Sequence, residues 1–239
     1  MNQYELKGRV KKFIDNTFLK TSLELDISEE DLKEKIQAFV KESVQMDFKC
    51  VVVRPEHLNL AFNIKSKFKS SIKIATVVNF PLGTDSFDSI TKQLNKSKDF
   101  SDEIDIVVDY NAFKYSDFKR FDSLIELCTS FCLENDKIVK WIIETGALSK
   151  NEIKSICKRI EAIISSQFSN HLSKSYIKTS TGYYSGYGAK LDDIKLIKNS
   201  IKKMKIKASG GIKSKDFAEK LVKLGCDRIG TSSGKDILR

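Results

Sequence analysis

The chain has 239 residues, of which 41% are hydrophobic and 31% are charged, with only 2 Pro and 11 Gly. This composition excludes collagen-like, proline-rich and disordered proteins, and the length is enough for one large domain without disulfide bonds. The net charge of +10 comes from 36 Lys and only 6 Arg spread along the whole chain, which favours a solvated lysine-rich surface over a nucleic-acid footprint rich in Arg.

The first residues and the cysteines indicate a reducing compartment. Met1–Lys12 is polar and lacks the apolar core of a signal peptide, and no apolar run approaches the roughly 18 residues that span a bilayer. The five cysteines are an odd number, and none forms a Cys-x-x-Cys pair. We therefore expect a cytoplasmic protein without membrane association.

Eight short runs rich in β-branched residues recur along the chain, with starts 22 to 37 residues apart. Each interval has room for one strand, one helix and two loops, and the runs are apolar on both faces, as in parallel strands covered by helices. The predicted strands are Phe13–Thr17, Cys50–Val53, Ile74–Val78, Ile104–Val108, Val139–Ile143, Tyr176–Thr179, Ile206–Ala208 and Arg228–Gly230.

The segments between these runs carry capping signals and helical periodicity. Ser28 is a predicted N-cap, with Asp31 completing a weak capping box. Ser149 and Glu152 form a second capping box, and Gly225 stands where a later helix should end.

Eight strand–helix units in a chain of this length predict an α/β fold, a TIM (β/α)8 barrel formed by residues 1–239 as a single domain. A doubly wound open sheet is the alternative, but no G-x-G-x-x-G follows the first strand. A barrel places catalytic groups at the carboxyl ends of its strands and a phosphate site after strands seven and eight. The positions of the glycines fit such a phosphate site, because Gly210 and Gly211 follow the seventh run, and Gly230-Thr-Ser-Ser-Gly234 ends the eighth.

Four charged residues interrupt predicted strands: Asp105, Lys140, Lys178 and Lys207. Strand residues alternate between faces, and the outer face of a barrel packs on helices, so all four should point inward. One aspartate cannot neutralise three lysines, so at least one lysine should be driven towards its neutral amine by its cationic neighbours. A neutral lysine amine is the nucleophile of Schiff-base catalysis. The alternative is that Lys140 or Lys207 is a strand-end lysine that reaches solvent.

Other candidate groups carry weaker signals. His57 and His171 have no metal-ligand spacing, so no metal site is expected. Cys50 begins a strand and is expected in the core. Asp15, in Phe-Ile-Asp-Asn-Thr, is a further inward-pointing carboxylate whose candidate partner is a substrate hydroxyl.

Several strand-end segments together resemble the deoxyribose-phosphate aldolases, a family of class I aldolases with a TIM-barrel fold. The pair Lys178-Thr-Ser-Thr-Gly182 and Lys207-Ala-Ser-Gly-Gly211 is the most specific part of the resemblance. The other matching segments, in the family's order, are Ile14–Thr17, Ile74–Gly83, Glu103–Val107, Lys140–Gly146 and Arg228–Ser233.

The resemblance implies the family's reaction, the reversible cleavage of 2-deoxy-D-ribose 5-phosphate to acetaldehyde and D-glyceraldehyde 3-phosphate in deoxynucleoside catabolism. It implies that Lys178 forms the Schiff base, that Lys207 lowers the pKa of Lys178, and that Asp105 relays protons with Lys207 and a water. Lys140 and Asp15 match pocket residues near the substrate hydroxyls.

The resemblance also assigns the phosphate-binding turns, which offer N–H groups and hydroxyls without a fixed positive charge. The matching residues are Gly182, Gly210, Gly211, Gly230, Ser232 and Ser233. It implies no metal and no organic cofactor, and a phosphosugar substrate as the partner, with no specific nucleic acid and no membrane. For the assembly, a homodimer is one option.

Two departures from the family's pattern concern the rim of the site. Arg54-Pro55 stands where the family has a shorter polar residue before proline, and the loop Gly182-Tyr-Tyr-Ser-Gly-Tyr-Gly188 is richer in aromatic residues than usual. Two other functions remain open. One is a Schiff-base barrel aldolase or transaldolase that acts on a different phosphosugar, and the other is a non-enzymatic basic protein that binds nucleic acid.

Overall fold

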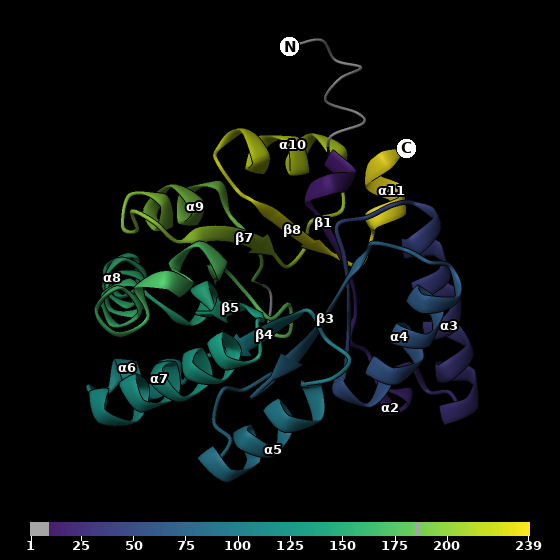
Figure 1. Cartoon of the computed structure of the whole chain (residues 1–239). Helices are drawn as coiled ribbons and strands as arrows, with labels where there is room; N and C mark the ends of the chain where they lie inside the picture. The colour runs from purple at the N-terminus through teal and green to yellow at the C-terminus, as the bar shows by residue number, and fades with distance from the viewer. Residues whose placement is uncertain (1–9, 185–186) are drawn as a thin grey trace.

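The computed structural model describes residues 10–184 and 187–239, which form a closed barrel of eight parallel strands (Figure 1). Each strand pairs with the next one along the chain, and β8 pairs with β1. The strands are β1 (Ile14–Phe18), β2 (Cys50–Val53), β3 (Lys73–Val78), β4 (Glu103–Val107), β5 (Ile138–Ile142), β6 (Ser175–Lys178), β7 (Lys205–Ser209) and β8 (Arg228–Thr231). The predicted TIM barrel is confirmed, and the open sheet is excluded.

Helices cover the outside of the barrel between successive strands (Figure 1). The α-helices are α2 (Ser22–Leu25), α3 (Glu29–Gln45), α4 (Leu58–Lys67), α5 (Phe87–Ser97), α6 (Tyr110–Lys114), α7 (Phe118–Glu134), α8 (Lys150–Gln167), α9 (Leu191–Lys198), α10 (Lys215–Lys223) and α11 (Gly234–Leu238). Short 3-10 helices are η1 (Lys11–Phe13), η2 (Pro55–His57), η3 (Thr145–Ala147) and η4 (Ser169–Lys174). The prediction for the polar N-terminus falls mainly on residues 1–9, outside the described ranges, so the single domain over residues 1–239 stays a prediction.

The predicted caps hold, with one difference in detail. The Ser149 hydroxyl accepts the Glu152 N–H, and the Glu152 side chain accepts the Ser149 N–H, which is a complete capping box. Ser28 caps α3 by accepting the Asp31 N–H, but the Asp31 carboxylate accepts the Ser28 hydroxyl instead of its N–H. The shorter Asp side chain therefore leaves this capping box incomplete.

The inside of the barrel is divided between an apolar and a charged part. Inward-facing Cys50 and Val52 of β2 pack with Leu19 and with Ala75 and Val77 of β3 in a small core of their own. The remaining strands, from β4 round to β1, carry charged residues at inward positions, and these strands build the site described below.

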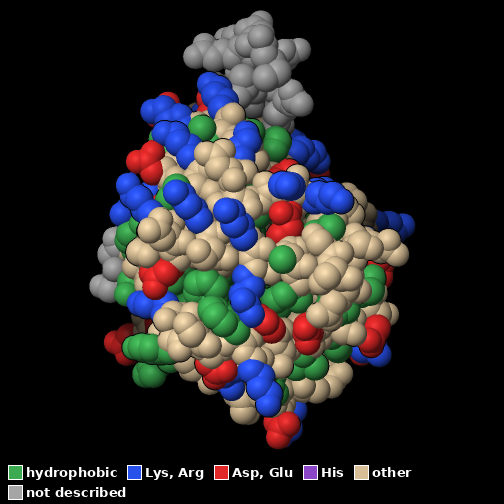
Figure 2. All heavy atoms as spheres, turned by 90° about the vertical axis from the view of Figure 1, so that its left-hand side faces the viewer, with side chains coloured by type: hydrophobic (Ala, Val, Ile, Leu, Met, Phe, Trp, Pro, Cys, Tyr) green, Lys and Arg blue, Asp and Glu red, His purple; other side chains and the backbone are tan. Residues whose placement is uncertain are grey.

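The outer surface agrees with a solvated lysine-rich shell. On the face at the left of Figure 1, Lys and Arg side chains are separated by neutral and acidic ones and do not form one continuous stripe (Figure 2). All five cysteines are buried thiols. Among the helices that the structure describes, none is long and apolar enough to cross a membrane.

Candidate active site

A carboxylate at the centre of the barrel holds three lysine ammonium groups. Asp105 of β4 accepts Lys140 through Oδ1 at 2.9 Å, and its Oδ2 accepts Lys178 at 2.8 Å and Lys207 at 2.7 Å. Asp105, Lys140 and Lys207 are fully buried, and Lys178 is 2% exposed. The four charged residues that interrupt the predicted strands therefore meet at one point.

The register of the strands brings these side chains together. Lys178 is paired with Lys207 across β6 and β7, and Asp105 with Lys140 across β4 and β5. Paired residues of neighbouring strands share a face of the sheet, so each pair points towards the barrel axis. The alternative of strand-end lysines that reach solvent is wrong for Lys140 and Lys207.

Three further buried side chains, Asp15, Glu103 and Arg228, extend this group of charges. The Asp15 carboxylate accepts Arg228 at 2.5 Å through Oδ1 and lies 2.7 Å from Lys207 through Oδ2. Glu103 accepts the other Arg228 nitrogen at 2.6 Å and lies 2.6 Å from Lys140. Glu103 and Arg228 escape prediction because each begins a strand, where a charge is usually solvent-facing. Each stands two residues before another inward-facing residue, so the period-two alternation could have found them.

The resulting charged cluster has a balanced charge when Lys178 is neutral. Its carboxylates and basic groups are Asp15, Glu103, Asp105, Lys140, Lys178, Lys207 and Arg228. Three carboxylates against four basic groups leave one excess positive charge when all seven are ionised. A buried excess charge is costly, so the cluster favours loss of one proton.

Lys178 is the basic group of this cluster whose pKa is lowered. Burial lowers the pKa of Lys178 to about 8, the Lys207 and Lys140 ammonium groups act in the same direction, and Asp105 opposes them. The direction is as predicted, but burial is a larger cause than the cationic neighbours. A pKa of about 8 leaves about a tenth of Lys178 as free amine at pH 7, against well under a thousandth for an ordinary lysine.

Lys140 is held in the opposite state. Burial lowers its pKa, but Asp105, Asp15 and Glu103 outweigh burial and raise the pKa of Lys140 well above its ordinary value. Lys140 therefore remains an ammonium ion and is a poor nucleophile. Burial raises the pKa of Asp105, but the Lys140, Lys178 and Lys207 charges hold it well below its usual range, so Asp105 stays ionised.

A cavity of about 670 Å³ opens at the carboxyl ends of the strands and reaches Lys178. Lys178 lines this cavity, whereas Asp105, Lys140, Lys207 and Asp15 lie behind it in the charged cluster. The expectation that Asp15 and Lys140 lie beside substrate hydroxyls is therefore not supported. Their contacts are with charged side chains, which gives them an electrostatic position instead.

Glycine-rich turns form one wall of the cavity. Gly182, Gly210, Gly211, Gly230 and Ser232 all line it, as the resemblance implies. Gly210 and Gly211 have φ values of +95° and +69°, which only glycine adopts readily. Within the described ranges, the N–H groups of Gly211 and Ser232 have no acceptor, so they are free for an anionic ligand.

Two further observations concern the lining of this cavity. Ser233 does not line the cavity, and its N–H donates to Oγ1 of Thr231 at 2.9 Å. Lys20 and Lys213 also line the cavity, so it carries two cationic side chains in addition to these turns. These lysines lie in loops, where strand alternation gives no signal.

The two departures from the family's pattern meet at the mouth of the cavity. The Tyr183 hydroxyl and Nε of Arg54 both donate to the Leu19 carbonyl, at 2.9 and 2.6 Å. The Tyr183 ring packs edge-on against Phe80 with 5.2 Å between ring centroids, and the Arg54 guanidinium lies 5.8 Å from the same ring. Leu19 and Tyr183 both line the cavity, so these bonds join two of the segments that line it.

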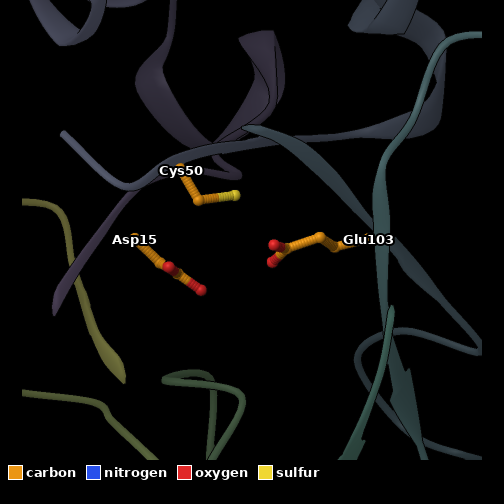
Figure 3. A group of neighbouring side chains, drawn as sticks. All are labelled: Asp15, Cys50 and Glu103. Carbon is orange, nitrogen blue, oxygen red and sulfur yellow. The ribbon is translucent and has the colours of Figure 1, made fainter. Parts of the chain in front are cut away.

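Three side chains of the barrel interior have the ligand types of a metal site. Asp15, Cys50 and Glu103 point towards one another from β1, β2 and β4, with ligand atoms within 4.8 Å of one another (Figure 3). Both carboxylates already pair with Arg228, and burial raises the pKa of the Cys50 thiol well above its ordinary value. A metal ion needs a deprotonated thiolate and carboxylates that are not already paired with a cation. These three side chains therefore fit a network of buried ion pairs better than a metal site.

Comparisons with known proteins agree over nearly the whole chain, although no family model matches it. A deoxyribose-phosphate aldolase of Aquifex aeolicus is 36% identical over 231 residues, which cover 95% of this chain and 94% of that protein. The deoxyribose-phosphate aldolase of Treponema denticola is 34% identical over 228 residues, with 94% and 96% covered. Among solved structures, the aldolase QR15 superposes with a TM-score of 0.80 at 32% identity, covering 96% of this chain and 94% of that one.

Proposed function

The chain belongs to the deoxyribose-phosphate aldolase family and is an aldolase, and from this premise we propose that Lys178 is the residue that forms its Schiff base. The reaction is the reversible cleavage of 2-deoxy-D-ribose 5-phosphate to acetaldehyde and D-glyceraldehyde 3-phosphate. The observation that carries the assignment is the position of Lys178. It lines the cavity, its pKa is lowered to about 8, and it shares one carboxylate oxygen of Asp105 with Lys207.

The first step is imine formation at C1 of the open-chain sugar. The neutral amine of Lys178 attacks the C1 carbonyl, and loss of water gives an imine that is protonated to an iminium ion. When Lys178 becomes an imine, its ammonium charge is replaced by an iminium charge at nearly the same place. Asp105 is therefore positioned to stabilise both forms.

The second step breaks the bond between C2 and C3. A base removes the proton of the C3 hydroxyl, the C3 oxygen becomes the carbonyl of glyceraldehyde 3-phosphate, and the bonding electrons flow into the iminium to give an enamine. Protonation of the enamine at C2 and addition of water release acetaldehyde and regenerate Lys178. We assign the proton relay to Asp105 and Lys207, with a water as the carrier to the substrate because both groups lie behind Lys178.

The phosphate end of the substrate is assigned to the glycine-rich wall. The free N–H groups of Gly211 and Ser232 supply donors, and Lys20 and Lys213 supply positive charge. Binding energy from the phosphate holds C1 near the amine, so an unphosphorylated sugar should react more slowly.

A panel of sugar phosphates tests this function against the nearest alternative. The proposal predicts release of acetaldehyde from 2-deoxyribose 5-phosphate that survives treatment with EDTA, and no transfer from 2-ketose phosphates. Transfer of a three-carbon unit from a 2-ketose phosphate, with deoxyribose 5-phosphate inert, would identify a transaldolase instead. An EDTA-sensitive cleavage would show a metal-dependent mechanism.

We propose the cytoplasm as the place of action, because five buried thiols suit a reducing compartment. We also propose that the protein forms a homodimer. Sedimentation equilibrium tests it, and a monomer at micromolar concentration would contradict it.

A further inference from the structure

Glu144 has an unusual backbone for a residue with a side chain. It follows β5 with φ of 52° and ψ of 70°, in the left-handed region that non-glycine residues rarely adopt. The neighbouring N–H groups fix it on both sides, because Ile143 donates to the Lys178 carbonyl at 3.0 Å and Thr145 donates to the Thr179 carbonyl at 2.9 Å. Glu144 is therefore fastened beside the segment that follows the reactive lysine.

The Glu144 side chain holds the next part of that segment. Its Oε2 accepts the N–H of Thr181 at 3.1 Å and the Thr181 hydroxyl at 2.5 Å. The same hydroxyl oxygen accepts the N–H of Tyr183 at 3.0 Å. Thr181, Gly182 and Tyr183 all line the cavity, so one carboxylate oxygen fixes the turn that forms this part of the wall.

This arrangement combines two unfavourable features at one residue. Glu144 is 1% exposed, and its Oε1 has no hydrogen-bond partner among the described residues. Burial raises the pKa of Glu144, while the Thr181 donors and the charge of Lys178 act against burial. A strained backbone and an incompletely paired buried carboxylate persist only where something else compensates for them, and such features gather at functional sites.

We propose that Glu144 is a positioning residue for the aldol reaction. Its carboxylate accepts the N–H and the hydroxyl of Thr181 and so fixes the turn that presents the Gly182 N–H to the phosphate of the substrate, while Lys178 itself is held by Asp105. This inference rests on the proposed function, and no step of the mechanism above uses Glu144. It predicts that loss of the carboxylate weakens phosphosubstrate binding and leaves imine formation intact.

The test compares Glu144→Gly with Glu144→Gln. Glycine removes the carboxylate and adopts the left-handed backbone without strain, so this variant should fold. For Glu144→Gly we expect the KM for deoxyribose 5-phosphate to rise about tenfold or more, the size expected when a charge-assisted hydrogen bond is lost, with kcat changed less than about threefold. The kcat/KM for unphosphorylated deoxyribose should change little. Glu144→Gln should restore the KM to within about threefold, because its amide oxygen can accept both Thr181 donors.

Asp136→Gly is the matched control. Asp136 is also an acidic residue with a left-handed backbone, at φ of 54°, but it precedes β5 at the opposite end of the strand and pairs with Lys174. Its replacement should leave both KM values unchanged. A normal KM in Glu144→Gly, an equal loss for both sugars, or a Gln variant as impaired as the Gly variant would each overturn the inference.

Trapping with acetaldehyde and borohydride separates failure of this inference from failure of the proposed function. Lys178 should be ethylated in wild type and in Glu144→Gly alike. Loss of trapping only in Glu144→Gly would show that Glu144 acts on Lys178 and not on the turn. Absence of trapping at Lys178 in wild type would instead overturn the proposed function.

Discussion

Gly230 of β8 stands directly against the side chain of Lys207. A Cβ placed on Gly230 would lie 3.0 Å from Cε of Lys207 and 2.9 Å from Cβ of Ser209. The Lys207 ammonium is fixed 2.7 Å from both Asp15 and Asp105, so its stem cannot retreat without losing an ion pair. Gly230 is thus required for close packing against the second lysine, in addition to lining the cavity.

Replacement of Gly230 by Ala should therefore damage catalysis through Lys207. The added methyl group should displace the Lys207 stem, destabilise the fold by about 1–3 kcal/mol as overpacking does, and lower kcat about tenfold or more. Urea unfolding and steady-state kinetics measure the two effects. Unchanged stability together with unchanged kcat would show that the contact is not restrictive.

The pH dependence of the reaction should report the charges around Lys178. With the neutral amine of Lys178 as the proposed nucleophile, kcat/KM should rise as the pH passes about 8, the pKa of Lys178. Lys207→Leu removes a cation and leaves Asp105 free to hold Lys178 more tightly, and both changes raise the pKa of Lys178. The acidic limb of the pH–rate profile should then move up by about one pH unit or more, with a large loss of kcat.

Asp105→Asn is the opposite test of the same electrostatics. It removes the anion that raises the pKa of Lys178, so the acidic limb should move to lower pH while proton transfer slows. Both profiles moving in the same direction, or neither moving, would contradict the electrostatic account of the charged cluster.

Arg228 should be a large contributor to stability. Arg228→Met removes one of the two cations that Asp15 and Glu103 share and leaves Lys140 as the other, and the loss of two buried ion pairs should cost about 3–5 kcal/mol. Burial raises the pKa of Asp15, but Arg228, Lys140 and Lys207 together hold it below its usual range. The ion-pair stabilisation is therefore present above about pH 4 and is lost as the pH falls through the lowered pKa.

Urea unfolding at pH 7 measures the loss in Arg228→Met. The double variant Arg228→Met with Glu103→Gln should recover part of it, because one of the two carboxylates that lose their pairing with Arg228 is replaced by a neutral amide. A single variant with nearly wild-type stability would mean that Arg228 only fills space.

The phosphate wall should be sensitive to added negative charge. Ser232 is exposed and lines the cavity, so Ser232→Asp should fold normally and place a carboxylate beside the phosphate. We expect the KM for deoxyribose 5-phosphate to rise about tenfold, with little change for unphosphorylated deoxyribose. Ser232→Asn is the neutral control of similar size. An equal rise in KM for both sugars in Ser232→Asp would contradict the assignment of the phosphate site to the glycine-rich wall.

The sequence predicts the barrel well because its signals are local. All eight strands begin within one residue of their predicted starts, since a parallel strand buried on both faces must be a short β-branched run. Asp105, Lys140, Lys178 and Lys207 are found by the same rule, as charges in otherwise apolar strands. Register then places them together without further information.

The parts that escape prediction depend on contacts between distant segments. The Tyr183 hydroxyl donates to the Leu19 carbonyl, which lies 164 residues away in the sequence. No sequence pattern in either loop predicts that hydrogen bond. Glu144 lies in a short connection after β5, where its left-handed backbone and its bond to Thr181 become visible only in three dimensions. The sequence also predicts the wrong main cause for the lowered pKa of Lys178. The cationic neighbours contribute, but burial contributes more.

Mass mapping of the trapped enzyme is the most direct measurement of the central claim, that Lys178 is the nucleophile. The protein is incubated with acetaldehyde near pH 7, reduced with borohydride and digested. A lysine with an ordinary pKa has almost no free amine at this pH, so the account predicts one ethyl group on Lys178, loss of activity in proportion to labelling, and no such label in Lys178→Leu. An ethyl group on Lys140 or Lys207 with Lys178 unmodified would contradict the account.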